Sequence, residues 1–159
     1  MQVSVVAVGR IKEKYLKDGI AEYSKRLTGI IKLNLIELND EGGSASPGAA
    51  EILHIKNREG QRLLSAIPDN CYTIALDLGG KQLGSEQLAQ KIADLTLCGC
   101  SHIVFIIGGS WGLSEAVLRR ADYRLSFGGF TFPHQLMRLI LLEQIYRSFK
   151  IIRNEPYHK

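Results

Sequence analysis

The sequence has few of the residues and segments that mark the specialised classes of protein. Its 159 residues include three cysteines, four prolines and one tryptophan. So few cysteines exclude a disulfide-rich scaffold and indicate a reducing compartment. No apolar run approaches the ~18 residues of a membrane-spanning helix. Met1 to Val5 lack the basic and apolar regions of a signal peptide, so we expect a cytoplasmic protein with no membrane partner.

A metal site is not expected either. Cys98, Cys100 and His102 form one tight cluster of three candidate ligands, whereas a structural zinc ion takes four ligands at tetrahedral spacing. The cysteines are better explained as thiols that pack beside a strand.

The composition is that of an ordinary globular domain with basic ends. Hydrophobic residues make up 45% of the chain and charged residues 23%, which excludes a disordered or fibrous protein. The length predicts a single domain over residues 1–159. Lys and Arg outnumber Asp and Glu by seven to three in residues 1–32 and by five to two in residues 133–159. The net charge of +4 is compatible with nucleic-acid binding but does not establish it.

Short apolar runs alternate with segments of helical periodicity along the whole chain. The runs predict strands at 2–8, 32–38, 71–78, 102–107 and 123–127. The periodic segments predict helices at 12–27, 47–66, 86–97, 115–120 and 133–152, with Ser46, Ser85 and Ser114 as N-caps. This alternation predicts an α/β fold with a mainly parallel sheet flanked by helices.

Three segments that follow predicted strands are candidates for a ligand site. They span residues 78–81, 108–112 and 127–132, and ligands of such sheets bind outside the carboxyl ends of the strands. The segment 108–112 matches neither the dinucleotide fingerprint nor the P-loop. It is either a simple tight turn or a binding loop, and its three glycines favour a binding loop.

The predicted C-terminal helix is apolar around most of its circumference. Such a helix is buried on several sides, which predicts a dimer interface as well as a contribution to the core. Glu143 and Arg147 are four residues apart and can pair along this helix. The pair is either a surface salt bridge of little energetic value or the rim of a site.

Several motifs together resemble one known family. They are ALDLGGK at 75–81, FIIGGSWG at 105–112, the TFPHQ segment within 125–138, EQIYR at 143–147 and the ending PYHK at 156–159. In this combination the whole chain resembles the RlmH family. Members of that family are small SPOUT-type methyltransferases that act on N3 of a pseudouridine in 23S ribosomal RNA.

The resemblance implies a fold, a cofactor and a partner. The fold would be of the SPOUT type, with a C-terminal trefoil knot. The protein would be a homodimer, and the C-terminal tail of one chain would reach toward the cofactor of the other. The cofactor would be S-adenosylmethionine, and the matching positions that would contact it are Leu76, Gly108, Phe127, Gly128, Gly129, Phe130, Thr131 and Phe132.

The resemblance also implies that residues near the end of the chain form the catalytic centre and contact RNA. The catalytic candidates are Glu143, Arg147, Tyr157 and His158, and the candidates for RNA contact are Arg138, Arg153 and Lys159. Methylation at N3 removes a proton, and Glu143 and His158 are both bases by chemical type. The arginines can stabilise negative charge or hold phosphate, and Tyr157 can stack on the base or hydrogen-bond to it.

Two other functions are compatible with the same sequence. One is a methyltransferase of the same fold that acts on another RNA, and the other is a non-catalytic ribosome-binding module. The intact glycine loops and the complete tail argue against the non-catalytic module. The modest net charge of +4 suits a substrate that is recognised on the assembled 70S ribosome, where shape adds to charge. We expect Trp111 either to stack on adenine or to pack as a lid. The N-terminal basic residues are expected either to form a solvated helix face or to contact RNA phosphates; they are Arg10, Lys12, Lys14, Lys17, Lys25 and Arg26.

Overall fold

The computed structural model describes residues 1–157 and confirms the α/β fold. Strands and helices alternate strictly along the chain. The elements are β1 (Gln2–Val8), α1 (Lys14–Leu27), β2 (Lys32–Leu38), α2 (Ala49–Ala66), β3 (Tyr72–Gln82), α3 (Ser85–Leu97), β4 (His102–Ile107), α4 (Glu115–Arg120), β5 (Tyr123–Ser126) and α5 (His134–Ile152).

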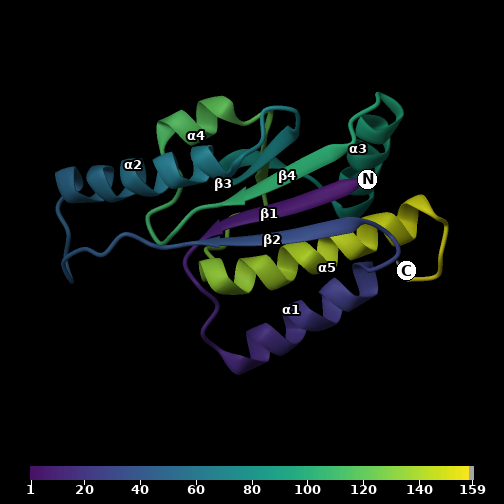
Figure 1. Cartoon of the computed structure of the whole chain (residues 1–159), viewed down its shortest axis with the longest axis horizontal. Coiled ribbons are helices and arrows are strands. Elements are labelled where there is room, and N and C mark those ends of the chain that lie inside the picture. The colour runs from purple at the N-terminus through teal and green to yellow at the C-terminus, as the bar shows by residue number, and fades with distance from the viewer. Residues whose placement is uncertain (158–159) are drawn as a thin grey trace.

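The five strands form one parallel sheet with the order β2-β1-β4-β3-β5. Helices α2 and α4 cover one face, while α1, α3 and α5 lie on the other (Figure 1). Because all strands run in one direction, their carboxyl ends and the loops that follow lie at the same edge of the sheet.

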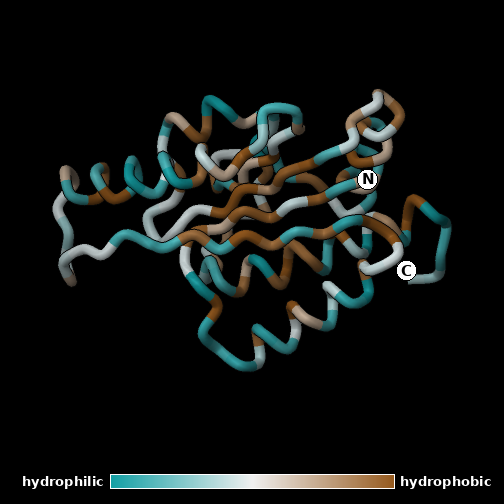
Figure 2. The backbone as a smooth tube through the Cα atoms, in the orientation of Figure 1, coloured by the Kyte–Doolittle hydropathy of each residue, from teal (hydrophilic) through white to brown (hydrophobic). Residues whose placement is uncertain are grey.

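The two central strands, β1 and β4, are buried on both faces. Val5 and Phe105 pack with α5 and α3, whereas Val6 and Ile106 pack with α2 and α4. Burial on both faces explains why these strands are nearly continuous apolar runs in the sequence. The same apolar band crosses the middle of the molecule in Figure 2.

The predicted strands agree with the structure to within one residue except at the end of β3. The sequence predicts a turn at residues 79–81, but β3 continues to Gln82. Leu76 and Lys81 both pair with Leu125, so residues 77–80 form a bulge. Gly80 permits this bulge, since a Cβ there would lie 2.7 Å from the Arg124 backbone. The turn prediction was wrong because the bulge depends on pairing with β5, which is distant in sequence.

Two of the three predicted N-caps are also wrong. Helix α2 begins at Ala49 with Gly48 as N-cap, and α3 begins at Ser85 with Gly84 as N-cap. At α3 the Gln87 side chain accepts a hydrogen bond from the Gly84 amide at 2.9 Å, which satisfies that group without a serine. The Ser114 cap is confirmed, because its Oγ accepts from the Val117 amide at 3.4 Å.

Helix α5 joins the two ends of the molecule. It begins near the carboxyl ends of the strands and runs back beneath the sheet to the opposite edge, where the described chain ends (Figure 1). Its apolar residues Leu141, Leu142, Ile145 and Phe149 pack with α1, α3 and the central strands. Within residues 1–157, no helix has the length and apolarity that a membrane crossing requires.

We expect Gly60→Ala to destabilise the protein by about 1–3 kcal/mol, the usual cost of overpacking. Helices α2 and α4 meet at Gly60, where an added Cβ would lie 2.2 Å from Ser114 Oγ. That hydroxyl caps α4 and cannot move without losing its contact. Urea unfolding of the variant and the wild type measures the difference.

The double variant Gly60→Ala/Ser114→Gly is the control for this steric effect. Ser114→Gly removes the clashing atoms and costs only a few tenths of a kcal/mol at an N-cap. The double variant should therefore be more stable than the sum of the single effects predicts. Strict additivity would contradict the steric explanation.

Candidate functional site

The three predicted strand-end segments form one cleft of about 540 Å³ at the carboxyl edge of the sheet. This volume lies in the range typical of small-molecule sites. Seven of the eight predicted cofactor residues line the cleft, and Gly129 does not; the seven are Leu76, Gly108, Phe127, Gly128, Phe130, Thr131 and Phe132. The structure thus brings these residues together, and their contact with a cofactor stays a prediction.

The glycine loop that follows β4 is both a tight turn and a wall of the cleft. The Gly112 amide donates to the Gly109 carbonyl at 3.1 Å, and Gly112 has a φ of +83° that favours glycine. Residues 107–113 all line the cleft. The two interpretations of this loop are therefore compatible, since the turn exposes backbone groups to the cleft.

The mouth of the cleft is apolar and exposed. Trp111 is 43% exposed and Phe130 is 80% exposed, with Leu78 and Phe132 nearby in the lining. Isolated apolar side chains are common on protein surfaces, but a cluster beside a cleft marks a binding surface. Trp111 lines the cleft, and whether it stacks on a ligand or covers it stays open.

A buried carboxyl group supports the glycine loop from below. Glu59 of α2 is 3% exposed, and its Oε1 accepts a hydrogen bond from the Glu41 amide at 3.0 Å. Its Oε2 has no hydrogen-bond partner among the described residues and would lie 2.7 Å from a Cβ on Gly109. Burial raises the pKa of Glu59 above its ordinary value.

Sequence reasoning missed Glu59, although the sequence contains a signal. Ile55, Glu59 and Leu63 follow one another at intervals of four, so Glu59 lies on the buried face of α2. A carboxyl group on an apolar helix face is rarely fully buried without a specific reason.

A second cluster of polar side chains lies along α5. Arg147 donates to Glu143 Oε1 through Nε at 3.0 Å and through Nη2 at 2.5 Å. The Tyr157 hydroxyl donates to the same oxygen at 3.2 Å, and its ring lies 4.7 Å from the Arg147 guanidinium carbon. The resemblance implied that Glu143, Arg147 and Tyr157 belong to one centre. The structure brings these three side chains together, and their catalytic roles stay a prediction. His158 and Lys159 lie outside the described residues.

The environment of Tyr157 keeps its hydroxyl protonated. Burial raises the pKa of Tyr157 most strongly, and the neighbouring Tyr23 hydroxyl and Glu143 carboxylate raise it further. Its ring also packs edge-on against Tyr146 at 4.9 Å. In this arrangement Tyr157 is a hydrogen-bond donor and not a base.

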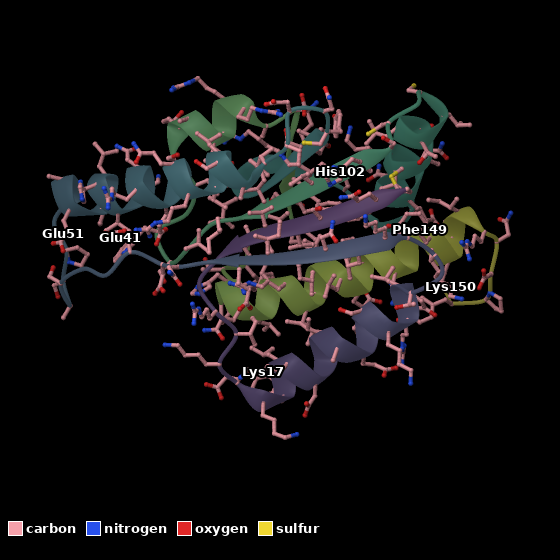
Figure 3. All side chains as sticks on the ribbon, in the orientation of Figure 1. Lys17, Glu41, Glu51, His102, Phe149 and Lys150 are labelled. Carbon is pink, nitrogen blue, oxygen red and sulfur yellow. The ribbon has the colours of Figure 1, made fainter. Side chains whose placement is uncertain are left out.

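The cluster and the cleft are separate within one chain. Met137 lines the cleft, whereas Arg147 is ten residues further along α5, about 15 Å at the rise of a helix. Phe149 and Lys150 in Figure 3 mark this distant end of α5. Arg153 is exposed and lies 3.9 Å from Glu155. None of Glu143, Arg147 and Tyr157 lines the cleft.

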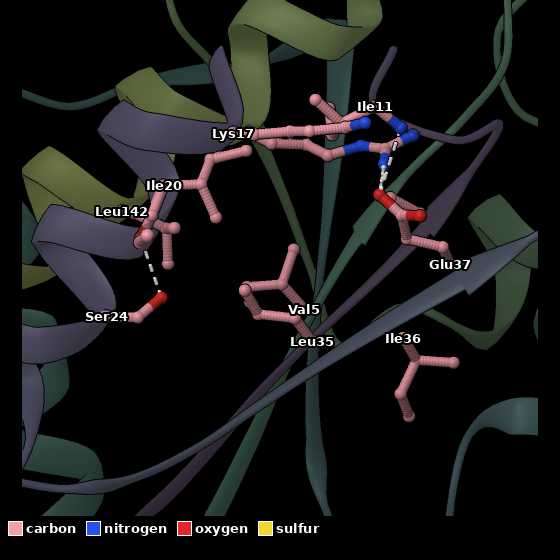
Figure 4. Close-up of a pocket in the computed structure, with 12 residues that line it drawn as sticks. Val5, Ile11, Lys17, Ile20, Ser24, Leu35, Ile36, Glu37 and Leu142 are labelled. Atoms are coloured by element: carbon pink, nitrogen blue, oxygen red, sulfur yellow. Dashed lines mark hydrogen bonds and ion pairs between the residues drawn. The ribbon is translucent and has the colours of Figure 1, made fainter. Parts of the chain in front are cut away.

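The structure does not fit the prediction that Arg138 contacts RNA. Arg138 is 5% exposed, and its Nη2 donates to the carbonyls of Val8 and Gly9 at 2.5 and 2.7 Å. Its Nη1 donates to Glu37 at 2.8 Å, a contact drawn at the end of an apolar hollow between α1 and the sheet (Figure 4). The sequence pattern could not reveal this, because the acceptors lie about 100 or more residues away in the chain.

Two of the three residues considered as metal ligands in the sequence, Cys100 and His102, contact other protein groups. His102 Nε2 lies 2.9 Å from Ser4 Oγ, and Cys100 Sγ contacts the His102 carbonyl at 3.4 Å. Over residues 1–157, no three His, Cys, Asp or Glu side chains are arranged to hold a metal ion.

The structure thus combines an all-parallel sheet, a ligand-sized cleft at its carboxyl edge and a long helix that returns beneath the sheet. A family model described as "Predicted SPOUT methyltransferase" matches residues 1–158, and the chain belongs to this family. A solved tRNA (m1G37) methyltransferase from Aquifex aeolicus has a similar fold, with a TM-score of 0.56 and 13% identity. That likeness covers 100% of this chain and 75% of the other, and it concerns the fold alone.

Two curated relatives are much more similar to this chain in sequence than the solved structure is. Proteins of Alkaliphilus oremlandii and Carboxydothermus hydrogenoformans are 58% and 57% identical to this chain over 159 residues, with full coverage of both sequences. Both carry the name Ribosomal RNA large subunit methyltransferase H.

Glu59→Gln is expected to raise the melting temperature at about pH 8, and the gain should shrink toward about pH 4. The raised pKa means that the folded protein binds this proton more tightly than the unfolded chain does. Folding stability therefore falls as pH rises through the folded-state pKa. Glutamine keeps an oxygen for the Glu41 amide and cannot ionise. Thermal unfolding across this pH range measures the effect.

Glu51→Gln is a matched control on the same helix. Hydrogen bonds from the backbone and side chain of Ser44 lower the pKa of Glu51. Its ionised form stabilises the fold above the unfolded-state pKa, so this variant should be less stable than the wild type at about pH 8. A Glu59→Gln variant with the pH dependence of the wild type would contradict the role of burial.

Proposed function

We propose that this protein transfers a methyl group from S-adenosylmethionine to N3 of a pseudouridine in 23S ribosomal RNA, on the assembled 70S ribosome. The observation that carries the proposal is the cleft that residues 76–78, residues 107–113 and most of the segment 127–132 line together. The names of the two relatives that match over their full length support the choice of ribosomal RNA as substrate. The family itself implies a methyl donor.

The residues of the cleft fit S-adenosylmethionine. Leu76 and Phe127 offer apolar surface for an adenine ring, and the glycine loop offers backbone groups for its polar edge. When bound, the donor supplies an electrophilic methyl group on sulfur. We assign its contacts to Leu76, Gly108 and the segment 127–132, including Gly129, and the chain's part is to orient the donor for an in-line displacement.

The cluster on α5 suits the acceptor. Arg147 forms an ion pair with Glu143. Its positive charge can also stabilise the anion that forms when N3 of the pseudouridine loses its proton. Tyr157 stays protonated, so it donates a hydrogen bond or stacks on the base. The proton is taken by Glu143 or by His158. Arg153 and Lys159 are assigned to RNA contact.

The separation of the two parts supports a homodimer. One chain holds its own Tyr157 cluster about 15 Å along α5 from its own cleft, so a complete site requires the cluster of a second copy. We propose that two copies pair with the tail of one beside the cleft of the other. The single domain at 1–159, the C-terminal trefoil knot and the cytoplasmic location belong to the same proposal.

We expect labelled methyl from S-adenosylmethionine to be incorporated into 70S ribosomes that lack the modification. Mapping should place the label on N3 of one pseudouridine of 23S ribosomal RNA. Thr131→Trp fills the cleft without changing a glycine and should abolish transfer. The surface variant Glu22→Gln should retain it, since Glu22 forms a surface ion pair with Arg26 on α1 and does not line the cleft.

Two results would contradict this assignment in different ways. Label in free ribosomal RNA or transfer RNA but not in ribosomes would identify another RNA substrate. Ribosome binding without any binding of S-adenosylmethionine would indicate a non-catalytic module.

The homodimer leads to an independent prediction. Thr131→Trp and Arg147→Ala should each be inactive alone. A mixed dimer, purified by two different tags after co-expression, has one site with both parts intact. It should recover about half of the wild-type activity. If cleft and cluster acted within one chain, every site in the mixed dimer would be defective and activity would not return.

A further inference from the structure

We propose that Asp77 and Arg124 bind the amino-acid part of the methyl donor, with Asp77 accepting from its ammonium group and Arg124 donating to its carboxylate. The inference rests on the proposed function and assigns a role to two residues that sequence analysis left without one. Both residues line the cleft, close in sequence to positions already assigned to the donor. Asp77 directly follows Leu76, and Arg124 lies three residues before Phe127.

The two side chains form the one ion pair among the described residues that line the cleft. Arg124 donates to Asp77 Oδ2 through Nε at 3.0 Å and through Nη2 at 2.5 Å. Their side chains are 45% and 21% exposed, respectively. The pair is therefore accessible from the cleft and is held in a fixed orientation by two hydrogen bonds.

The geometry of this pair leaves hydrogen-bonding groups of both side chains available to a ligand. Both hydrogen bonds end on the same carboxylate oxygen, Oδ2. Asp77 Oδ1 accepts no hydrogen bond from any described residue, and Arg124 Nη1 donates to none. A guanidinium has five N–H donors and a carboxylate two acceptor oxygens. One acceptor and several donors thus remain, side by side, for a ligand.

A zwitterion matches this arrangement. An α-amino acid group carries an ammonium and a carboxylate on one carbon, and its dipole can lie antiparallel to that of the Asp77–Arg124 pair. Each charge then meets its opposite, through charge-assisted hydrogen bonds that are stronger than neutral ones. The adenine and ribose parts of the donor carry no such pair of charges.

The bulge in β3 holds the pair in place. A Cβ on Gly79 would lie 3.1 Å from Arg124 Nη2 and 3.2 Å from Asp77 Oδ2, so the ion pair packs closely over this glycine. Residues 77–80 leave the regular ladder between the Leu76 and Lys81 pairings with Leu125. The irregularity that sequence analysis missed therefore places the carboxylate at the wall of the cleft.

Binding of two related ligands tests the proposal. S-adenosylhomocysteine carries the zwitterion and has no net charge, whereas 5′-methylthioadenosine has the same adenine, ribose and thioether but no amino-acid part. Asp77→Asn and Arg124→Gln should each weaken S-adenosylhomocysteine about tenfold, which corresponds to about 1.4 kcal/mol. The Kd of 5′-methylthioadenosine should stay within about twofold of the wild-type value. Calorimetry measures both ligands on the full-length protein.

The second ligand shows whether the cleft is intact. A variant that binds 5′-methylthioadenosine normally has kept its fold, and Glu22→Gln controls for the loss of one negative charge. Equal weakening of both ligands would overturn the proposal, because Asp77 would then bind ribose or only shape the bulge. Unchanged binding of S-adenosylhomocysteine would overturn it as well. A wild-type protein that binds neither ligand would instead refute the proposed function.

Discussion

All five strands run in the same direction, and this shared direction determines where the loops, the helices and the cleft lie. Parallel strands place every carboxyl end at one edge, so loops that are far apart in sequence form one cleft. Parallel strands also require helices on both faces, and the central strands are consequently nearly continuous apolar runs. The same runs of valine and isoleucine that stabilise the core thus determine where a ligand can bind.

Helix α5 connects the carboxyl edge of the sheet with the opposite edge. It must return from the carboxyl edge beneath the sheet, and its length then carries Glu143 and Arg147 away from the cleft. A helix so deeply packed cannot bend to bring the two parts together within one chain. The separation of cleft and cluster is therefore a direct result of the packing, and it makes a second copy of the chain part of the proposed site.

Much of this architecture was predictable from sequence, and the exceptions share a cause. Buried strands such as β1 and β4 are predictable because burial on both faces leaves an unmistakable apolar run. The bulge at 77–80 depends on pairing with β5, and the burial of Arg138 depends on carbonyls of Val8 and Gly9. Local pattern contains no information about such distant partners. Glu59 differs, since its place on the apolar face of α2 was visible in the sequence.

The contacts of Arg138 also bear on how a ligand enters and leaves. Its guanidinium joins the first turns of α5 to the end of β1 and, through Glu37, to the edge strand β2. The helical side of the cleft is thereby anchored to the rigid sheet and forms a stationary wall. The segment 127–132 contains no helix or strand, so it is the part of the cleft wall that the sheet restrains least. In enzymes, loops of this kind are often the part that moves when a ligand enters or leaves a site.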